Sequence, residues 1–318
     1  MQIGVIGCGR WGSFIAWYLD RIGHDVSLYG RSDSSRMQQF LLTRGNGLVT
    51  LEKSVRLTTS LPEAAEAETI VISIGSQGLR ALMEELKALG LTNKTFVLCM
   101  KGLEIGSGKR LTEIVTEYMD PHCHAAVWLG PGHVQEFCNG TPNCMVIDSG
   151  EEAVTKVLVE AFSSELIRFY YGQDLIGNEI GAAAKNVIGI AAGILDGLGL
   201  STLKGALTSR GTREVGRLIA AMGGSELSAY GLCHLGDYGA TVFSPYSHNR
   251  RYGEMFVTGE PFEGLAEGVY TVRALMTLSE RYGVELPICA AVHAALYESV
   301  DVKDALERLF TRSLKPEF

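Results

Sequence analysis

Residues 2–12 read QIGVIGCGRWG, a short apolar run that leads directly into a G-x-G-x-x-G loop. A helical pattern and a second apolar run follow before residue 30. In such a strand–loop–helix–strand unit, Gly7 permits the tight turn, Gly9 lets the backbone approach a pyrophosphate, and Gly12 lets the helix pack close to the strand. The N-terminus of the helix also offers free N–H groups to phosphates. We therefore predict a dinucleotide site; the alternative is a glycine-rich turn without a ligand.

The end of the second apolar run indicates which dinucleotide is bound. A site for NAD usually carries an acidic residue there, which accepts the ribose 2′-OH. This chain has Tyr29-Gly30-Arg31-Ser32 instead, and the nearest acid is Asp33. Arg31 can pair with a 2′-phosphate and stack on the adenine. The sequence therefore favours NADP over NAD, unless Arg31 is only a solvated loop residue.

Strand and helix patterns alternate through the first half of the chain. Further strands are expected at residues 69–74, 95–100, 125–129, 143–147 and 167–171. This alternation predicts an α/β fold with a Rossmann-type, doubly wound and mostly parallel sheet, which binds ligands at the carboxyl ends of its strands.

The second half of the chain has a different pattern, without a convincing strand. Long helical patterns rich in Ala and Leu occupy residues 176–199, 203–222, 264–282 and 288–299. We therefore predict two domains, with residues 1–174 binding the dinucleotide and residues 175–318 forming an all-helical substrate and catalytic domain. A cleft between two domains is a common place for a cofactor and its substrate.

The composition limits the class of protein. The 318 residues include 28 Lys and Arg against 36 Asp and Glu, so no basic field is present to collect nucleic-acid phosphates. No apolar run reaches the ~20 residues of a membrane span, and the N-terminal pattern is not that of a signal peptide. Seven cysteines in no paired spacing suggest reduced thiols, and the PHCH stretch around Cys123 lacks distant partners for a metal. We expect a cytoplasmic protein that binds a small molecule, with no metal, nucleic acid or membrane span.

Two polar stretches stand out in the helical half. Lys185 and Asn186 lie in an otherwise apolar helical pattern, where a buried lysine needs a partner or loses its charge. Such a lysine can act as a general acid or base on a substrate hydroxyl or carbonyl; the alternative is an exposed helix lysine. The second stretch, residues 236–241 and 247–251, is rich in turn formers and is expected to be a loop that binds an anion or is merely solvated.

Short polar and glycine-containing elements recur along the whole chain. They are G-x-G-x-W-G at residues 7–12, Ser76-Gln77, Lys101-Gly102-Leu103-Glu104, Gly130-Pro131, Glu179-Ile180-Gly181, Lys185-Asn186-Val187-Ile188, Ala191-Ala192-Gly193-Ile194, Asp196-Gly197-Leu198-Gly199, Arg210-Gly211, Leu235-Gly236-Asp237, Asn249-Arg250-Arg251, Glu267-Gly268-Val269 and Arg312-Ser313-Leu314-Lys315. In this order they resemble the NAD(P)-dependent glycerol-3-phosphate dehydrogenase family nearly from end to end. The resemblance implies an oxidoreductase that transfers hydride between dihydroxyacetone phosphate and sn-glycerol 3-phosphate, a precursor in phospholipid biosynthesis.

The resemblance also implies roles for individual residues. Lys185 would be the catalytic lysine that exchanges the proton at the C2 oxygen, with Lys101 at the junction of nicotinamide and substrate and Asp237 orienting Lys185. These three would also bind the substrate. Further substrate-binding residues would be Gly130, Asn186, Thr241, Ser247, His248 and Asn249. The cofactor would contact Gly7, Gly9, Arg10, Trp11, Gly12, Arg31, Lys101, Val134 and Glu267.

Three positions depart from the family pattern. His248 stands where the family has an arginine that binds the substrate phosphate, and histidine lacks the bidentate fork; Arg250 or Arg251 is a candidate replacement. Gly132 takes the place of a serine or threonine near the substrate, and Thr202 that of an asparagine. Two alternatives therefore stay open: a reductase of the same build for a different small oxo or hydroxy compound, and a non-catalytic dinucleotide-binding protein. A homodimer is also left open.

Overall fold

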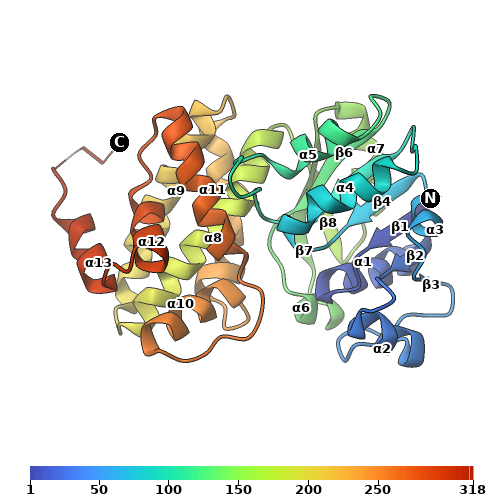
Figure 1. Cartoon of the computed structure of the whole chain (residues 1–318), viewed down its shortest axis with the longest axis horizontal. Coiled ribbons are helices and arrows are strands. Elements are labelled where there is room, and N and C mark those ends of the chain that lie inside the picture. The colour runs from blue at the N-terminus through green and yellow to red at the C-terminus, as the bar shows by residue number, and fades with distance from the viewer. Residues whose placement is uncertain (315, 318) are drawn as a thin grey trace. The chain divides into compact units, whose positions relative to one another are not determined.

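The computed structural model describes residues 1–314 and 316–317. The chain divides into two compact units (Figure 1). The first, which we call the sheet unit, comprises residues 1–101 and 109–179, and the second, the helical unit, comprises residues 102–108 and the described part of 180–318. The sequence placed the division after residue 174; in the structure the main division falls inside a long helix, after Glu179.

Within the described residues, eight strands form one sheet in the order β3-β2-β1-β4-β5-β6-β7-β8. The strands are β1 (Gln2–Ile6), β2 (Asp25–Tyr29), β3 (Arg56–Thr58), β4 (Thr69–Ile72), β5 (Thr95–Leu98), β6 (His124–Leu129), β7 (Asn143–Ser149) and β8 (Ile167–Tyr171). All neighbours pair in parallel except β6 and β7, which are antiparallel. The predicted doubly wound, mostly parallel sheet is confirmed.

Helices follow most of the strands and cover the sheet (Figure 1). The helices of the sheet unit are α1 (Arg10–Arg21), α2 (Ser35–Thr43), α3 (Leu61–Ala65), α4 (Leu79–Lys87), α5 (Leu111–Tyr118), α6 (Val134–Cys138) and α7 (Glu152–Phe162). All four residues of β4 are buried, which is why this strand is a continuous apolar run rather than an alternating one. Tyr18 on α1 is also buried, and its hydroxyl donates a hydrogen bond of 2.5 Å to the carbonyl oxygen of Phe162 on α7.

The helical unit is built around one long helix. Helix α8 (Leu175–Gly197) begins in the sheet unit and continues into the helical unit. The helices that follow are α9 (Lys204–Ala221), α10 (His248–Thr258), α11 (Glu267–Tyr282), α12 (Pro287–Tyr297) and α13 (Val302–Phe310). By length and composition α8 could cross a membrane, but 83% of its most apolar 18-residue window is buried inside the protein, as in a core helix.

Helices α8 and α10 cross with their backbones in contact. A Cβ atom added to Gly193 on α8 would lie 1.8 Å from the carbonyl oxygen of Arg250, and one added to Gly253 on α10 would lie 2.1 Å from that of Ile190. Glycine is therefore required on both helices at this crossing. The close approach brings the start of α10 to the middle of α8, where Lys185 and Asn186 lie.

The prediction of a loop for residues 236–241 and 247–251 was wrong. Leu235–Asp237 forms a 3-10 turn and Gly239–Phe243 a π-helical turn. The second segment begins α10: Ser247 is its N-cap, and the Ser247 hydroxyl accepts a hydrogen bond from the Arg250 amide at 3.3 Å. The serine and asparagine that suggested a loop are also typical of a helix start, because their oxygens satisfy the free N–H groups.

Candidate active site

The glycine loop has the shape that a dinucleotide requires. A Cβ atom on Gly7, whose φ is +113°, would lie 2.2 Å from the carbonyl oxygen of Ser73, and one on Gly12 would lie 1.9 Å from that of Gly7. A Cβ atom on Gly9 would meet only a guanidinium nitrogen of Arg36, at 3.9 Å. Gly9, the N-cap of α1, makes no side-chain capping hydrogen bond. The loop therefore leaves room for a pyrophosphate at the N-terminus of α1.

The other residues predicted to contact the cofactor differ in their surroundings. Trp11 packs against Phe14 and Phe137, with ring centroids 5.2 and 6.1 Å away, so its ring supports the packing of α1 and α6. Arg31 follows β2, has a side chain that is 67% exposed, and lies 3.3 Å from a carboxylate oxygen of Glu85 on α4. Two further residues lie at helix starts: Arg10 is exposed at α1, and Val134 is buried at α6.

Lys101 links the carboxyl ends of β5 and β6. Its ammonium group donates a hydrogen bond of 2.5 Å to the carbonyl oxygen of Gly130. Gly130 and Gly132 have φ angles of +129° and +140°, a region that favours glycine. A Cβ atom on Gly132 would also lie 2.3 Å from the ring of Phe137. Phe137 therefore explains why a serine or threonine is absent here.

Lys185, Asp237 and Thr241 are in direct contact in the helical unit. The Nζ atom of Lys185 lies 2.7 Å from Oδ2 of Asp237 and donates a hydrogen bond of 2.6 Å to Oγ1 of Thr241. The three residues are 6%, 1% and 2% exposed. The structure thus places Lys185 in the protein interior with a carboxylate partner, and the alternative of an exposed helix lysine is wrong.

Asn186 and Asn249 form a second polar chain beside this contact. The side-chain amide of Asn249 donates a hydrogen bond of 3.0 Å to the amide oxygen of Asn186. The backbone N–H of Gly268, in the first turn of α11, donates to the Asn249 side chain at 2.9 Å. A Cβ atom on Gly268 would lie 2.6 Å from the carbonyl oxygen of Asn186. Helices α8, α10 and α11 are therefore joined at the residue that follows Lys185.

The basic side chains beside Asn249 have different surroundings. The ring of His248 is half-buried, and its Nδ1 lies 3.3 Å from the carbonyl oxygen of Leu265. The guanidinium group of Arg250 is held by Asp196 at 3.2 Å and by Glu254 at 2.9 Å. Arg250 is therefore already paired with two carboxylates, whereas Arg251 is exposed.

Glu267, the remaining residue that the resemblance suggested, is the first residue of α11 and is half-buried.

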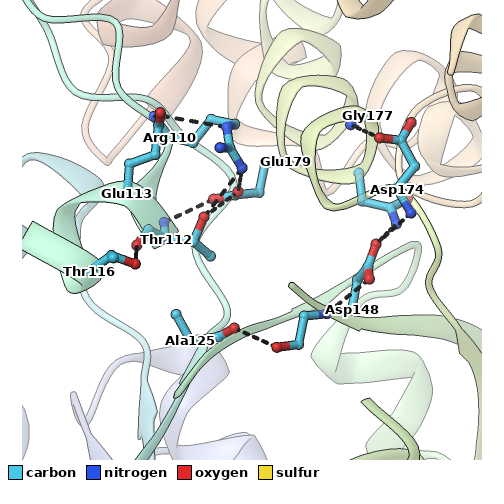
Figure 2. Close-up of polar contacts among 11 residues, drawn as sticks. Arg110, Thr112, Glu113, Thr116, Ala125, Asp148, Asp174, Gly177 and Glu179 are labelled. Atoms are coloured by element: carbon cyan, nitrogen blue, oxygen red, sulfur yellow. Dashed lines mark hydrogen bonds and ion pairs between the residues drawn. The ribbon is translucent and has the colours of Figure 1, made fainter. Parts of the chain in front are cut away.

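The sequence suggested no role for two buried polar groups. The carboxylate of Glu179, near the start of α8, accepts hydrogen bonds from the Arg110 guanidinium at 2.8 Å and from the Thr112 hydroxyl at 2.6 Å (Figure 2). Burial raises the pKa of Glu179, and Arg110 partly offsets this effect. The second group is the pair of His234 and Tyr238, whose side chains lie 2.7 Å apart. Sequence spacing gives no signal for such partners, because they lie far apart along the chain or on separate turns.

A second network of hydrogen bonds fixes the start of α8. The buried carboxylate of Asp148 accepts from the backbone N–H of Asp174 at 3.0 Å and from the side chain of Asn178 at 2.7 Å (Figure 2). The Asp174 carboxylate in turn accepts from the N–H of Gly177 at 3.0 Å. An aspartate directly before an apolar helical pattern is a recognised signal for the start of a helix. Asp174 is therefore the residue of this network that the sequence alone can indicate.

The helical unit also contains a cavity of about 810 Å³. Its walls are mostly apolar side chains of α8, α9, α12 and α13, for example Leu195, Leu207 and Ile288. The residues that line it do not include Lys185 or Asp237. The cavity is therefore separate from the contact between these two side chains.

Comparison with known proteins identifies the family of the chain. The models for the N-terminus and the C-terminus of NAD-dependent glycerol-3-phosphate dehydrogenase match residues 2–155 and 174–307. A glycerol-3-phosphate dehydrogenase (NAD(P)+) of Prosthecochloris aestuarii is 38% identical over 100% of both chains, and one of Pelodictyon phaeoclathratiforme is 36% identical over 100% of this chain and 99% of the other. The crystal structure of a glycerol-3-phosphate dehydrogenase from Coxiella burnetii has a TM-score of 0.92 and 27% identity, and covers 98% of this chain and 99% of its own. The chain therefore belongs to the NAD-dependent glycerol-3-phosphate dehydrogenase family.

Proposed function

We propose that the protein catalyses the reversible, NAD(P)-dependent reduction of dihydroxyacetone phosphate to sn-glycerol 3-phosphate. The observation that carries this proposal is the buried contact of Lys185 with Asp237 and Thr241. The desolvation cost of a buried ion pair can exceed the attraction between its charges, so a paired lysine at this depth in a core helix points to a reason beyond folding. Proton transfer to a carbonyl oxygen is such a reason.

Different residues are assigned to cofactor binding and to proton transfer. The open loop at Gly9 and the N-terminus of α1 would hold the pyrophosphate of the cofactor, and the cofactor would supply the hydride for the C2 carbon of the substrate. As negative charge grows on the C2 oxygen, the ammonium group of Lys185 stabilises that charge and gives up a proton from Nζ to the oxygen. In the reverse direction, the neutral amine accepts the proton of the C2 hydroxyl.

The neighbours of Lys185 determine where its proton points. Asp237 and Thr241 both accept from Lys185 Nζ, so they direct two of its three ammonium protons. Lys101 is a second candidate for contact with the substrate, and its ammonium group is positioned by the carbonyl oxygen of Gly130. Asn186 and Asn249 hold the polar groups of the substrate.

The phosphate end of the substrate is assigned to the start of α10. Ser247 and His248 lie there, where backbone N–H groups and the helix dipole favour an anion. Arg250 does not replace the arginine of the family, because Asp196 and Glu254 already hold its guanidinium group. Phosphate recognition then depends on His248, the helix start and the exposed Arg251.

The cofactor preference is assigned to Arg31. The residue follows the second strand of the Rossmann unit, its side chain is largely exposed, and no acidic residue occupies its position. A guanidinium group at this place can bind a 2′-phosphate bidentately, which favours NADP over NAD.

We further infer a cytoplasmic homodimer whose product is a precursor of glycerophospholipids. All seven cysteines are free thiols, which fits a reducing compartment. The helical unit exposes large apolar side chains, among them Leu227, Phe243 and Phe310 at 76%, 57% and 67%, and surfaces of this kind mark contacts between proteins. Light scattering should give twice the mass of the chain, and a monomer at micromolar concentration would contradict the dimer.

A substrate panel tests the proposed reaction. The oxidation of NADPH and of NADH is followed with dihydroxyacetone phosphate, with unphosphorylated dihydroxyacetone and with small 2-oxo acids. Turnover that is selective for dihydroxyacetone phosphate supports the proposal. Preferential turnover of a 2-oxo acid would show that the substrate is a 2-oxo acid and not dihydroxyacetone phosphate. Cofactor binding without any turnover would support a non-catalytic protein.

A further inference from the structure

His234 is a fully buried histidine with a defined partner on each ring nitrogen. Its Nδ1 lies 2.8 Å from the carbonyl oxygen of Gly181 on α8, and its Nε2 lies 2.7 Å from the hydroxyl of Tyr238. A carbonyl oxygen can only accept, so Nδ1 carries a proton and donates it to Gly181. In the neutral ring, Nε2 accepts from the Tyr238 hydroxyl.

The ring of His234 is neutral in the folded protein. Burial lowers its pKa to about 4, and the charge of Lys185 acts in the same direction, whereas the nearby carbonyl groups and Asp237 oppose the shift. Tyr238 faces Thr212, Glu214 and Cys289, and burial raises the pKa of its hydroxyl well above the ordinary range. Both groups therefore stay uncharged at neutral pH and act only through hydrogen bonds.

These hydrogen bonds connect the two backbone segments that carry Lys185 and Asp237. His234 directly precedes the turn Leu235–Asp237, and its carbonyl oxygen accepts from the N–H of Asp237 at 3.0 Å. Tyr238 directly follows Asp237. Gly181 lies on α8, four residues before Lys185. In an α-helix each N–H donates to the carbonyl oxygen four residues earlier, so the Gly181 carbonyl oxygen is the acceptor for the Lys185 N–H.

The two segments approach closely at position 181. A Cβ atom on Gly181 would lie 3.0 Å from Cβ of His234, which is tighter than most Cβ contacts and would push the histidine away from the helix by a few tenths of an ångström. The histidine thus reaches the helix backbone one turn before the lysine. Two apolar side chains could fill the same volume without the cost of burying a ring and a hydroxyl, so the polar pair points to a positional role.

We propose that His234 and Tyr238 are a positioning pair, which holds the turn of Asp237 against α8 and thereby sets the contact between Asp237 and Lys185. The proposal assigns the pair no contact with substrate or cofactor. It acts through Lys185 and therefore rests on the proposed function of that residue. Without His234 and Tyr238, the contact between Lys185 and Asp237 loosens. A lysine that loses its carboxylate partner gives up its proton at lower pH.

Three variants and one matched control test the pair. Tyr238→Phe removes only the hydroxyl, His234→Asn keeps an N–H donor near the position of Nδ1, and His234→Leu removes both hydrogen bonds. Tyr18→Phe is the control, because it removes another buried hydroxyl with a 2.5 Å hydrogen bond, in the core of the sheet unit. For each variant the melting temperature, kcat, KM for dihydroxyacetone phosphate and the pH profile of kcat are measured.

We expect Tyr238→Phe to lower kcat about tenfold and to change KM less than about twofold, because a misplaced catalytic group acts on turnover rather than on binding. The limb of the kcat profile that reports Lys185 should move to lower pH by about half a unit or more. His234→Asn should retain more activity than His234→Leu. Tyr18→Phe should lower the melting temperature and leave kcat and its pH profile unchanged.

Two outcomes would overturn the inference, and they are distinguishable. If Tyr238→Phe behaves like Tyr18→Phe, with lower stability and an unchanged kcat profile, while Lys185→Ala is inactive, the pair only fills the core and the proposed function stands. If Lys185→Ala keeps wild-type turnover, the proposed role of Lys185 fails, and the role of the pair fails with it.

Discussion

Arg110 and Glu179 form a buried ion pair in which Nη1 of the arginine lies 2.8 Å from Oε2 of the glutamate (Figure 2). Their side chains are 15% and 5% exposed. Glu113 approaches the same guanidinium group at 3.5 Å, but its side chain is 44% exposed. One arginine therefore has a buried and an exposed carboxylate partner, and the buried one belongs to the helix that carries Lys185.

The two partners of Arg110 should contribute unequally to stability. Glu179→Ala removes the buried partner and leaves Arg110 and the Thr112 hydroxyl without their acceptor, so we expect a loss of about 3–5 kcal/mol. Glu113→Ala removes the exposed ion pair and the carboxylate that accepts a hydrogen bond from the Arg110 backbone N–H, which should cost about 1 kcal/mol. Urea unfolding of both variants measures the difference. Equal losses would show that burial does not decide the strength of these contacts.

The stability of the protein should fall on acidification because of His234. Burial lowers its pKa to about 4 from the ordinary value of 6.5, so the unfolded chain binds a proton before the folded one does. The contribution of the neutral His234 ring to the free energy of unfolding is fully present above pH 6.5. It is lost as the pH falls towards 4, and the total loss is on the order of 3 kcal/mol. In His234→Asn this loss is absent, so the stability advantage of the wild type should shrink by about 2 kcal/mol between about pH 7 and about pH 5. An advantage that is independent of pH would refute a buried, neutral His234.

Phosphate recognition should improve when an arginine replaces His248. A guanidinium group at the start of α10 adds a bidentate, permanently charged contact, so His248→Arg should lower KM for dihydroxyacetone phosphate about tenfold. The KM for unphosphorylated dihydroxyacetone should not change. His122→Arg, at an exposed position of the sheet unit, controls for the added charge. No gain in His248→Arg would mean that the phosphate does not bind at this position.

The proposed preference for NADPH should depend on Arg31 and on its partner Glu85. Arg31→Ala should raise KM for NADPH about tenfold and leave KM for NADH nearly unchanged, because only NADPH carries the 2′-phosphate. Glu85→Gln removes the carboxylate that lies 3.3 Å from Arg31 and should lower KM for NADPH. Initial rates with both cofactors give these constants. If Arg31→Ala affects both cofactors equally, Arg31 does not read the 2′-phosphate.

Local sequence patterns were sufficient for most of the sheet. The expected strand at 167–171 coincides with β8, and the first strand coincides with β1, because each is an apolar or aromatic run bounded by turn formers. The pattern missed β3, since a strand of three residues at the edge of the sheet is too short to show a period. It also missed the helix α10, whose polar first turn resembles a loop.

The contacts of the site depend on chain segments that are distant in sequence. Lys185 was selected from its apolar surroundings alone, and the resemblance added Asp237, but neither could show that the two side chains are 2.7 Å apart. The hydrogen bond of His234 to Gly181 spans 53 residues and leaves no periodic signal. Likewise, only the structure shows that Phe137 excludes a side chain at Gly132.

The role of Lys185 is the central claim, and one comparison tests it most directly. The oxidation of NADPH with dihydroxyacetone phosphate is measured for the wild type and for Lys185→Ala, together with the affinity of each for NADPH. We predict that Lys185→Ala lowers kcat by a factor of about 10² to 10⁴, the usual contribution of a general acid, and leaves NADPH affinity within about twofold. A variant that retains wild-type turnover would contradict the account.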